Sequence, residues 1–239
     1  MKIFRTLFFV TVIFITAVNI SFGQNSTLKI NFEHYANGKK IVLSDSSYNN
    51  IFGEQYFIKK LRYYVSNLKV NGQAFTEDSL NYHLIDLAKS TSIKLPLTAG
   101  KYNKLVFMLG VDSSRNCSGI QQGALDPAKD MFWTWNTGYV VFKLEGTSSS
   151  SNADRNRIEH HVGGYRFGNN ISQFITFNIG EVVLKPDSIS EITINVNLDR
   201  YWDSVNTIRI SEDPICTLPG TLAKKIAANF PAMFTVKPE

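Results

Sequence analysis

The sequence is poor in the residue types and motifs on which most enzyme active sites depend. Its 239 residues include only two cysteines and four histidines. The chain has no G-x-S-x-G nucleophile elbow, no H-E-x-x-H zinc motif and no phosphate-binding loop. General acid–base catalysis needs two groups within reach of the substrate, and a sequence does not show such proximity. A hydrolase or lyase that uses Glu159 and His161 is therefore kept only as a residual alternative. We therefore expect a protein that is not an enzyme.

Clusters of positive charge are also missing. Lysine and arginine number 25, aspartate and glutamate number 20, and the net charge is +5, but the basic side chains are scattered. They are adjacent only at Lys39-Lys40, Lys59-Lys60 and Lys224-Lys225. Nucleic-acid binding usually requires a basic cluster that neutralises several phosphates. We expect no nucleic-acid partner.

One long apolar run stands at the N-terminus. Residues 6–22 are almost uncharged, follow a short basic start, and lead to Gly23 before a polar stretch. This order is typical of a secretory signal peptide, here residues 1–23, although about 17 apolar residues also approach the length of a transmembrane anchor. Cleavage would leave one domain, residues 24–239, with a net charge of +3. We expect it to be periplasmic or secreted (extracellular), without stable membrane insertion.

Export would place both cysteines in an oxidising compartment. A disulfide between Cys117 and Cys216 is the default expectation there. It would close a loop of about 100 residues and contribute roughly 4 to 5 kcal/mol by restricting the unfolded chain. Metal-binding thiolates are the alternative, and the absence of a C-x-x-C pair disfavours them.

Beyond the N-terminal run, apolar and polar residues alternate with the period of a half-buried β-strand. The pattern is clearest at residues 191–198, where every second residue is Ile, Val or Leu. The same alternation recurs at residues 28–34, 105–111, 140–144 and 175–179. Short strands separated by polar turns predict a mainly β fold, a single antiparallel β-sandwich or open barrel-like domain with long loops.

One short helix is predicted near the C-terminus. Leu222, Ile226 and Phe230 recur at a spacing of four, which is typical of one apolar helix face. Thr221 precedes them as a candidate cap, and Pro231 follows as a stop.

The longest stretch without strand alternation, residues 112–138, contains two of the three tryptophans. Loops of this length inside a compact domain are usually functional or disordered, and the aromatic content disfavours disorder. Trp133 and Trp135 are two residues apart, so both indoles face the same side of an extended backbone. Packing at one end of a sandwich is the plainer interpretation of both rings.

Histidine is the other scarce residue that could carry chemistry. Neutral imidazole is a common ligand for copper and zinc, provided that several ligands converge from separate strands. His34 ends an apolar strand face, whereas His160 and His161 are adjacent and would point to opposite faces of one strand. Core packing and cross-strand hydrogen bonds are the alternative roles, and His83 is interpreted as a surface or strand-packing residue.

Several strings of the sequence, taken in order, resemble a known family. They are Leu61-Arg62-Tyr63-Tyr64-Val65-Ser66-Asn67-Leu68, Leu109-Gly110-Val111-Asp112-Ser113, Gly123-Ala124-Leu125-Asp126-Pro127, Met131-Phe132-Trp133-Thr134-Trp135-Asn136-Thr137-Gly138-Tyr139, Lys143-Leu144-Glu145-Gly146 and His161-Val162-Gly163-Gly164. Together they resemble the MbnP-like family of exported bacterial copper-binding proteins, the partners of MauG-like diheme peroxidases. The most specific element is the W-T-W-N-T-G-Y string followed by L-E-G.

The resemblance implies copper, as Cu(I) or Cu(II), held by histidines in a β-rich fold. It places His161 in the His-x-Gly-Gly position and His34 in an F-x-H position, with His160 as a third candidate. It also implies that a tryptophan, Trp133 or Trp135, can be oxidised to kynurenine. An indole N–H only donates, whereas the aromatic amine of kynurenine can bind a metal.

These implications predict a copper-binding protein that acts in acquisition, storage or delivery, with a diheme MauG-like peroxidase as its partner. The alternative is an extracellular adhesion or ligand-binding module, in which Phe132, Trp133 and Trp135 form an aromatic platform. The copper hypothesis predicts that the imidazoles of His34 and His161 lie within about 4 Å of each other, since metal–nitrogen bonds are about 2.0 to 2.1 Å long.

Overall fold

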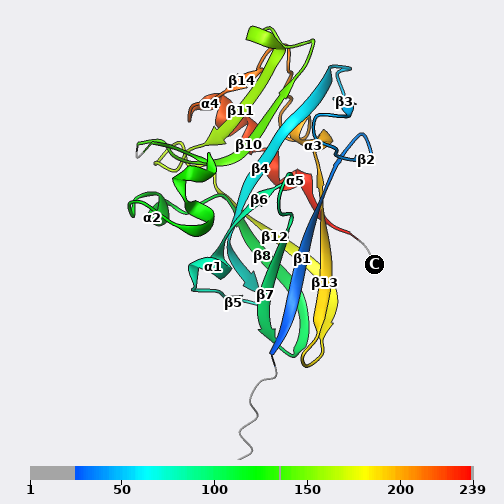
Figure 1. The fold of residues 1–239 in the computed structure, drawn as a ribbon, viewed down its shortest axis with the longest axis vertical. Coiled ribbons are helices and arrows are strands. Elements are labelled where there is room, and N and C mark those ends of the chain that lie inside the picture. The colour runs from blue at the N-terminus through cyan, green and yellow to red at the C-terminus, as the bar shows by residue number, and fades with distance from the viewer. Residues whose placement is uncertain (1–24, 135, 238–239) are drawn as a thin grey trace, which may run out of the picture.

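Two β-sheets packed face to face form most of the protein (Figure 1). The computed structural model describes residues 25–134 and 136–237. The strands are β1 (Asn25–Ala36), β2 (Lys39–Lys40), β3 (Ser47–Asn49), β4 (Gln55–Val70), β5 (Gln73–Ala74), β6 (Tyr82–Asp86), β7 (Ser92–Thr98), β8 (Gly100–Leu109), β9 (Phe132–Thr134), β10 (Gly138–Thr147), β11 (Arg157–Gly163), β12 (Gln173–Leu184), β13 (Ile189–Asn197), β14 (Ile215–Cys216) and β15 (Phe234–Val236). The helices are α1 (Asp78–Asn81), α2 (Ser113–Asn116), α3 (Asp199–Trp202), α4 (Thr221–Ala227) and α5 (Phe230–Met233), with 3-10 turns η1 (Gly123–Leu125), η2 (Pro127–Lys129) and η3 (Asp154–Asn156). The mainly β prediction is confirmed.

Each sheet contains one parallel strand pair, so the sheets are mixed rather than purely antiparallel. The five-stranded sheet has the order β15-β13-β1-β2, with β7 also paired to β1. The ten-stranded sheet has the order β12-β8-β4-β10-β11-β14, with β3, β5 and β6 on β4 and β9 on β10. The parallel pairs are β1 with β13 and β11 with β14. Parallel neighbours need long connections, which alternation within each strand does not reveal.

The sandwich core forms where the inner faces of the two sheets meet. Leu28, Ile30 and Phe32 of β1 are buried, as the alternation predicts. The ring of Phe32 lies 6.1 Å from the rings of both Tyr63 and Phe107 in the opposite sheet. Contacts across the layers therefore hold the sheets together as a sandwich, and the sheets do not close into a barrel.

The predicted C-terminal helix is present as α4. Its N-cap is Gly220, with a φ of 157°, rather than Thr221, which is already the first helical residue. Pro231 does not end this helix; it occupies the first turn of α5, where its missing N–H costs no hydrogen bond.

The expected disulfide is absent, because both cysteines are free. Cys117 follows α2 in an exposed loop, whereas Cys216 lies on β14 and is buried in the main core. The pairing of β14 with β11 places Cys216 opposite the buried His160. The expected signal peptide, residues 1–23, lies outside the described residues. No helix within residues 25–134 and 136–237 is long and apolar enough to cross a membrane.

Candidate metal centre

Strand register decides which face of the ten-stranded sheet each histidine occupies. On β11, His160 pairs with Leu144 of β10, and His161 pairs with Lys143. Leu144 belongs to the core, so His160 shares the inner face, while His161 shares the outer face with Lys143. The two adjacent histidines therefore point in opposite directions, as the sequence predicts.

Both ring nitrogens of His160 have hydrogen-bond partners. The Nε2 atom lies 2.7 Å from the carbonyl oxygen of Asp213, which can only accept, so Nε2 carries the proton. The Nδ1 atom lies 2.6 Å from the hydroxyl of Tyr201 and accepts its hydrogen bond. Burial lowers the pKa of His160 to about 4, so the ring is neutral near pH 7. This arrangement leaves no nitrogen lone pair open to a metal.

His34 is enclosed in the core between the sheets. Its exposed fraction is 1%, and its Nε2 atom lies 3.0 Å from the hydroxyl of Tyr63. The Nδ1 atom has no hydrogen-bond partner. Burial, with a smaller contribution from the charge of Lys40, lowers the pKa of His34 to about 4. His34 thus has an uncommitted nitrogen, but that nitrogen is buried.

The structure does not bring His34 and His161 together. Tyr63, which contacts His34, stacks on Phe142 in the core at a ring distance of 5.6 Å. Tyr63 and Phe142 are on the inner face of the ten-stranded sheet, whereas His161 is on the outer face of that sheet. Among the residues that the structure describes, no three His, Cys, Asp or Glu side chains are grouped so that they could hold a metal ion. The three predicted ligands therefore do not fit a single copper centre.

His161 has instead an acidic environment on the outer face. Its Nε2 atom lies 2.9 Å from Oε1 of Glu145, so Nε2–H donates to the carboxylate. Its Nδ1 atom lies 3.9 Å from Oε1 of Glu159 on the same strand. The side chain of His161 is 15% exposed to solvent. The Nδ1 atom of His161 therefore lies beside a second carboxylate at a place that solvent reaches.

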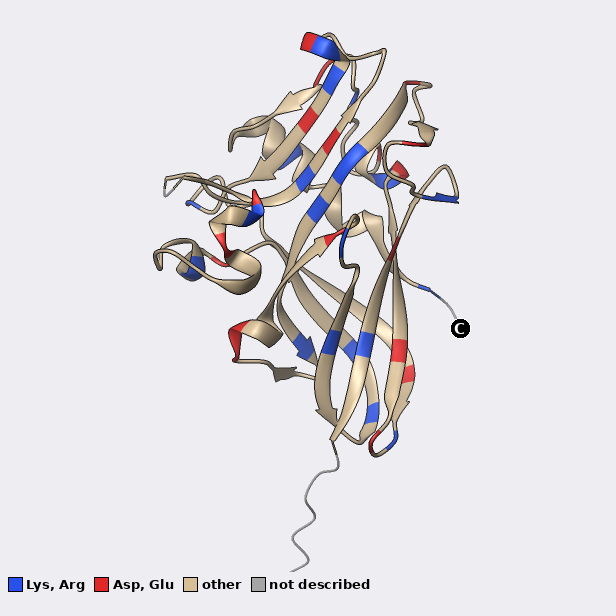
Figure 2. Cartoon of the chain, viewed as in Figure 1, with Lys and Arg blue, Asp and Glu red and all other residues tan. Residues whose placement is uncertain are grey.

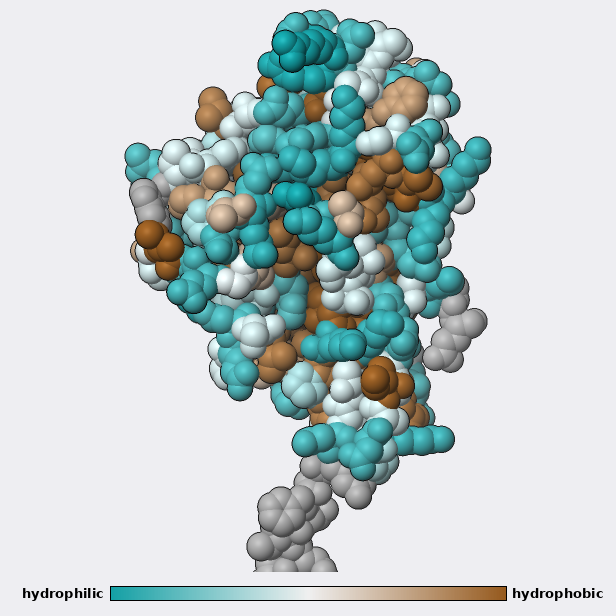
Figure 3. All heavy atoms as spheres, viewed as in Figure 1, coloured by the Kyte–Doolittle hydropathy of each residue, from teal (hydrophilic) through white to brown (hydrophobic). Residues whose placement is uncertain are grey.

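Glu145 connects this histidine to a network of ion pairs. Its other oxygen lies 3.0 Å from Nζ of Lys60, which also contacts Asp130 at 3.1 Å. The nearly buried Lys143 lies 3.0 Å from Asp130. The hydrogen bond from His161, together with Lys60, lowers the pKa of Glu145 to about 2. Figure 2 shows charges of both signs along these strands, and Figure 3 shows that this part of the surface is mostly hydrophilic.

Trp133 lies against the same strand as His161. It is half-buried on β9, which pairs with β10. A Cβ atom on Gly163 would lie only 2.8 Å from Cζ3 of Trp133, so the indole covers this glycine at close range. Gly163 is two residues beyond His161 and faces the same side, about 6.6 Å along the strand. The structure thus brings Trp133 near His161.

A profile of the MbnP family matches residues 25–218. The chain belongs to the MbnP family. A solved structure, MbnP from Methylosinus trichosporium, is similar in fold to this MbnP-family chain, with a TM-score of 0.61 and 14% sequence identity. The similarity covers 89% of this chain and 98% of the other. No curated protein matches the chain.

The sequence predicts that three aromatic residues, Phe132, Trp133 and Trp135, belong to the site of this MbnP-family protein. Trp135 lies outside the described residues. Phe132 packs on Tyr139 at a ring distance of 4.9 Å, and Trp133 covers Gly163. Phe132 and Trp133 are both half-buried against the protein, which for Trp133 agrees with the packing interpretation.

Glu145 is the site residue that sequence reasoning did not single out in this MbnP-family chain. The alternation of Val140, Phe142 and Leu144 already directs Glu145 outward. What the sequence lacks is the register of β10 with β11, which pairs Glu145 with Glu159 and sets both carboxylates beside His161.

Proposed function

We propose that this protein is an exported copper-binding protein whose metal site lies on the outer face of β10 and β11, with His161 as its imidazole ligand. The observation that carries this proposal is the pair of contacts made by His161. Metal-binding histidines commonly donate their second N–H to a carboxylate, which fixes the tautomer and orients the ring. Glu145 occupies that position at 2.9 Å from Nε2.

The second donor in this proposal is Glu159, whose carboxylate lies 3.9 Å from Nδ1 of His161. A site with one imidazole and one carboxylate suits Cu(II), because nitrogen and oxygen donors favour that ion, whereas Cu(I) prefers sulfur ligands. Two protein donors leave coordination positions for water, a partner protein or the amine of a kynurenine. His34 and His160 contribute to the stability of the core rather than to the metal site.

Trp133 supports the same location, because it covers Gly163, two residues beyond His161 on the same face of β11. We propose that Trp133 or Trp135 is the residue that a diheme MauG-like peroxidase oxidises to kynurenine. Intact-mass analysis of the native protein tests this step, since the modified residue gains one oxygen and loses one carbon. With no catalytic constellation in its sequence, the protein acts in copper acquisition, storage or delivery, in the periplasm or outside the cell.

Copper titration of the chelator-treated protein tests the proposal. We expect Cu(II) to bind with one equivalent seen by EPR, and His161→Ala to abolish that signal. Glu145→Gln should weaken binding by about tenfold or more, which is typical when the carboxylate behind a metal-binding histidine is changed. A parallel titration with Cu(I) against a weak chelator tests the preference for the oxidised ion.

His83→Ala is the matched control, because His83 lies on β6 and bonds the carbonyl of Leu80, away from β11. It should bind copper as the wild type does. Unchanged binding in His161→Ala would overturn the proposed site. Loss of binding in His34→Ala but not in His161→Ala would move the site to the core.

A further inference from the structure

A chain of tyrosine and tryptophan rings runs from the margin of the sandwich into its core. It begins at Tyr48 on β3, a strand that lies at the edge of the molecule in Figure 1 and whose other two residues are exposed. The ring centroids of Tyr48 and Tyr56 are 6.0 Å apart. The ring of Trp202 lies 5.2 Å from that of Tyr56 and 5.0 Å from that of Tyr201. Phenol and indole rings lose an electron more readily than a phenyl ring does, so an electron can move along this chain in short steps.

The last ring of the chain has a base beside its hydroxyl. Nε2 of His160 carries the proton that bonds the carbonyl of Asp213, so Nδ1 accepts the hydrogen bond from Tyr201 at 2.6 Å. Among the described residues, neither Tyr48 nor Tyr56 has an imidazole or a carboxylate as acceptor. Tyr201 is therefore the member of the chain that can release its proton as it loses an electron.

Trp202 can pass a positive charge on but is poorly placed to retain it. The side chain is fully buried, and no base among the described residues stands ready to take the proton of its indole N–H. Oxidised Trp202 would therefore remain a cation without a partner, which is costly in an apolar core. An electron from the neighbouring Tyr201 removes that charge.

We propose that Tyr201 and His160 form a site that stores one oxidising equivalent, which a one-electron oxidant at the surface delivers through Tyr48, Tyr56 and Trp202. The oxidant belongs to the class of high-potential metal complexes. This role is independent of copper binding, because it uses the inner face of the sheet rather than the outer one.

The reaction moves one electron and one proton. The oxidant takes an electron from the chain, which leaves Trp202 as a radical cation. Tyr201 then gives one electron to Trp202 and its hydroxyl proton to Nδ1 of His160. The products are the reduced oxidant, a neutral tyrosyl radical and an imidazolium whose Nε2–H still donates to Asp213. One electron from a reductant such as ascorbate returns the proton to Tyr201.

Tyr63 offers an internal comparison, because it is equally buried and also bonds a histidine. Phe142 stacks on both tyrosines, with ring distances of 5.6 Å to Tyr63 and 5.4 Å to Tyr201. Nδ1 of His34, however, has no hydrogen-bond partner, so an imidazolium there would leave one buried N–H unpaired. We therefore expect the radical on Tyr201 and not on Tyr63.

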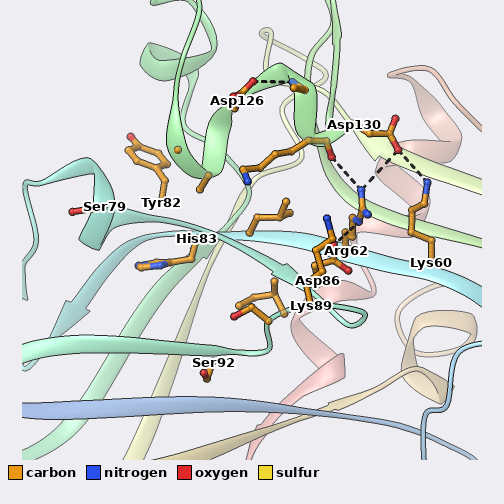
Figure 4. Close-up of a pocket in the computed structure, with 17 residues that line it drawn as sticks. Lys60, Arg62, Ser79, Tyr82, His83, Asp86, Lys89, Ser92, Asp126 and Asp130 are labelled. Atoms are coloured by element: carbon orange, nitrogen blue, oxygen red, sulfur yellow. Dashed lines mark hydrogen bonds and ion pairs between the residues drawn. The ribbon is translucent and has the colours of Figure 1, made fainter.

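Two tyrosines outside the chain also donate to a base. Tyr82, at one end of the groove in Figure 4, donates to Asp112 at 2.5 Å, and Tyr35 donates to Glu33 at 2.8 Å. A dissolved oxidant reaches such surface sites directly. A test of the buried site therefore needs the oxidant to be attached beside Tyr48.

A ruthenium polypyridyl complex attached to Ser47→Cys, in a Cys117→Ser background, provides that oxidant. Position 47 is exposed and adjoins Tyr48, whereas Cys216 is buried and remains unlabelled. A laser flash in the presence of an electron acceptor generates ruthenium(III) on the chelator-treated full chain. We expect transient absorption and EPR to show a long-lived neutral tyrosyl radical that ascorbate removes.

Three variants of this labelled protein locate the radical and its route. Tyr201→Phe should abolish the long-lived radical, because only the hydroxyl is lost. Trp202→Phe should reduce its yield to the level of Tyr201→Phe, since a phenyl ring does not carry the charge. Tyr63→Phe is the matched control, which loses a hydroxyl on the other side of Phe142 and should retain the radical. Circular dichroism checks that each variant is folded.

A measurement without substitution in the core complements these variants. Isotope-labelled histidine should change the nuclear couplings in the radical spectrum, because the transferred proton lies between the Tyr201 oxygen and Nδ1 of His160. Absence of a long-lived tyrosyl radical, or its persistence in Tyr201→Phe, would overturn the proposed site. Equal loss in Tyr63→Phe would also contradict it, and an unchanged yield in Trp202→Phe would overturn the route.

Discussion

Two of the four histidines are buried so deeply that water no longer stabilises their charged forms. His34 is 1% exposed and His160 is fully buried, and burial lowers the pKa of each to about 4. Each ring lies against a tyrosine hydroxyl, Tyr63 for His34 and Tyr201 for His160. The same side chains that suggest metal ligands in a sequence thus serve here as neutral polar members of an aromatic core.

The pKa of His34 predicts a fall in stability on acidification. In the unfolded chain a histidine titrates near 6.5, whereas folded His34 titrates near 4, so the unfolded state binds the proton first. The contribution of neutral His34 is present above pH 6.5 and is lost as the pH falls to about 4. Lys40 is the charged group that adds to this effect.

His34→Gln removes this titration. Between pH 6 and 4.5, the free energy of unfolding of the variant should depend less steeply on pH, by about one proton or roughly 1.4 kcal/mol per pH unit. Urea unfolding of chelator-treated protein at several pH values measures the slope. Glu181→Gln, on an exposed residue paired with Lys101, is the control. Equal slopes for wild type and His34→Gln would contradict the pKa of His34.

At the scale of elements, two glycines allow the close approach of β4 to β10 and of β9 to β11. A Cβ on Gly146 would lie 2.0 Å from the carbonyl oxygen of Phe57, where the register of β10 with β4 shifts. A Cβ on Gly163 would contact both Trp133 and the carbonyl of Tyr139. The L-E-G and H-V-G-G strings therefore each combine a polar side chain of the site with a glycine that the packing requires.

Gly163→Ala should displace the indole of Trp133. The added methyl group would lie 2.7 Å from the Tyr139 oxygen and 2.8 Å from the ring, so one of them must move. We expect a loss of stability of about 1 to 3 kcal/mol and a shifted tryptophan emission spectrum. Gly100→Ala is the control, because its nearest neighbour would be 3.8 Å away. Wild-type emission from Gly163→Ala would show that Trp133 does not cover this glycine.

The sequence predicts the strands well because burial on one face imposes a period of two, as in Ile192, Ile194 and Val196 of β13. It does not predict which strands are neighbours. Alternation shows that His160 and His161 face opposite ways, but not that His160 and His34 both face inward. The partner of His161, Glu145, becomes visible only through the pairing of β10 with β11, a long-range fact that no local pattern encodes.

At the scale of the whole molecule, packing between the two sheets, rather than a disulfide, stabilises the fold. Both cysteines are free, and they occupy different surroundings. Burial raises the pKa of the Cys216 thiol to about 12, so it is protonated and unreactive near neutral pH. Aromatic rings from both sheets, such as Phe32, Tyr63 and Phe107, meet across the interface instead.

This arrangement predicts that stability does not depend on redox conditions. A reducing agent should leave the melting temperature unchanged, and a thiol reagent should label Cys117 in the native protein and both cysteines only after unfolding. Cys117→Ser should melt as the wild type does. A melting temperature that falls on reduction, with no thiol in the unfolded protein beforehand, would restore the disulfide and its contribution of roughly 4 to 5 kcal/mol.

The parallel pairing of β1 with β13 has a consequence for how the chain folds. β1 begins at Asn25, but its neighbour begins at Ile189, and β15 completes that sheet only from Phe234 onward. Pairings between residues so distant in sequence form slowly, because closing the long loop between them costs conformational entropy before any stabilising contact forms. A chain still being synthesised, or one truncated before residue 189, therefore holds β1 with one side unpaired, and folding finishes only when almost the entire polypeptide is available.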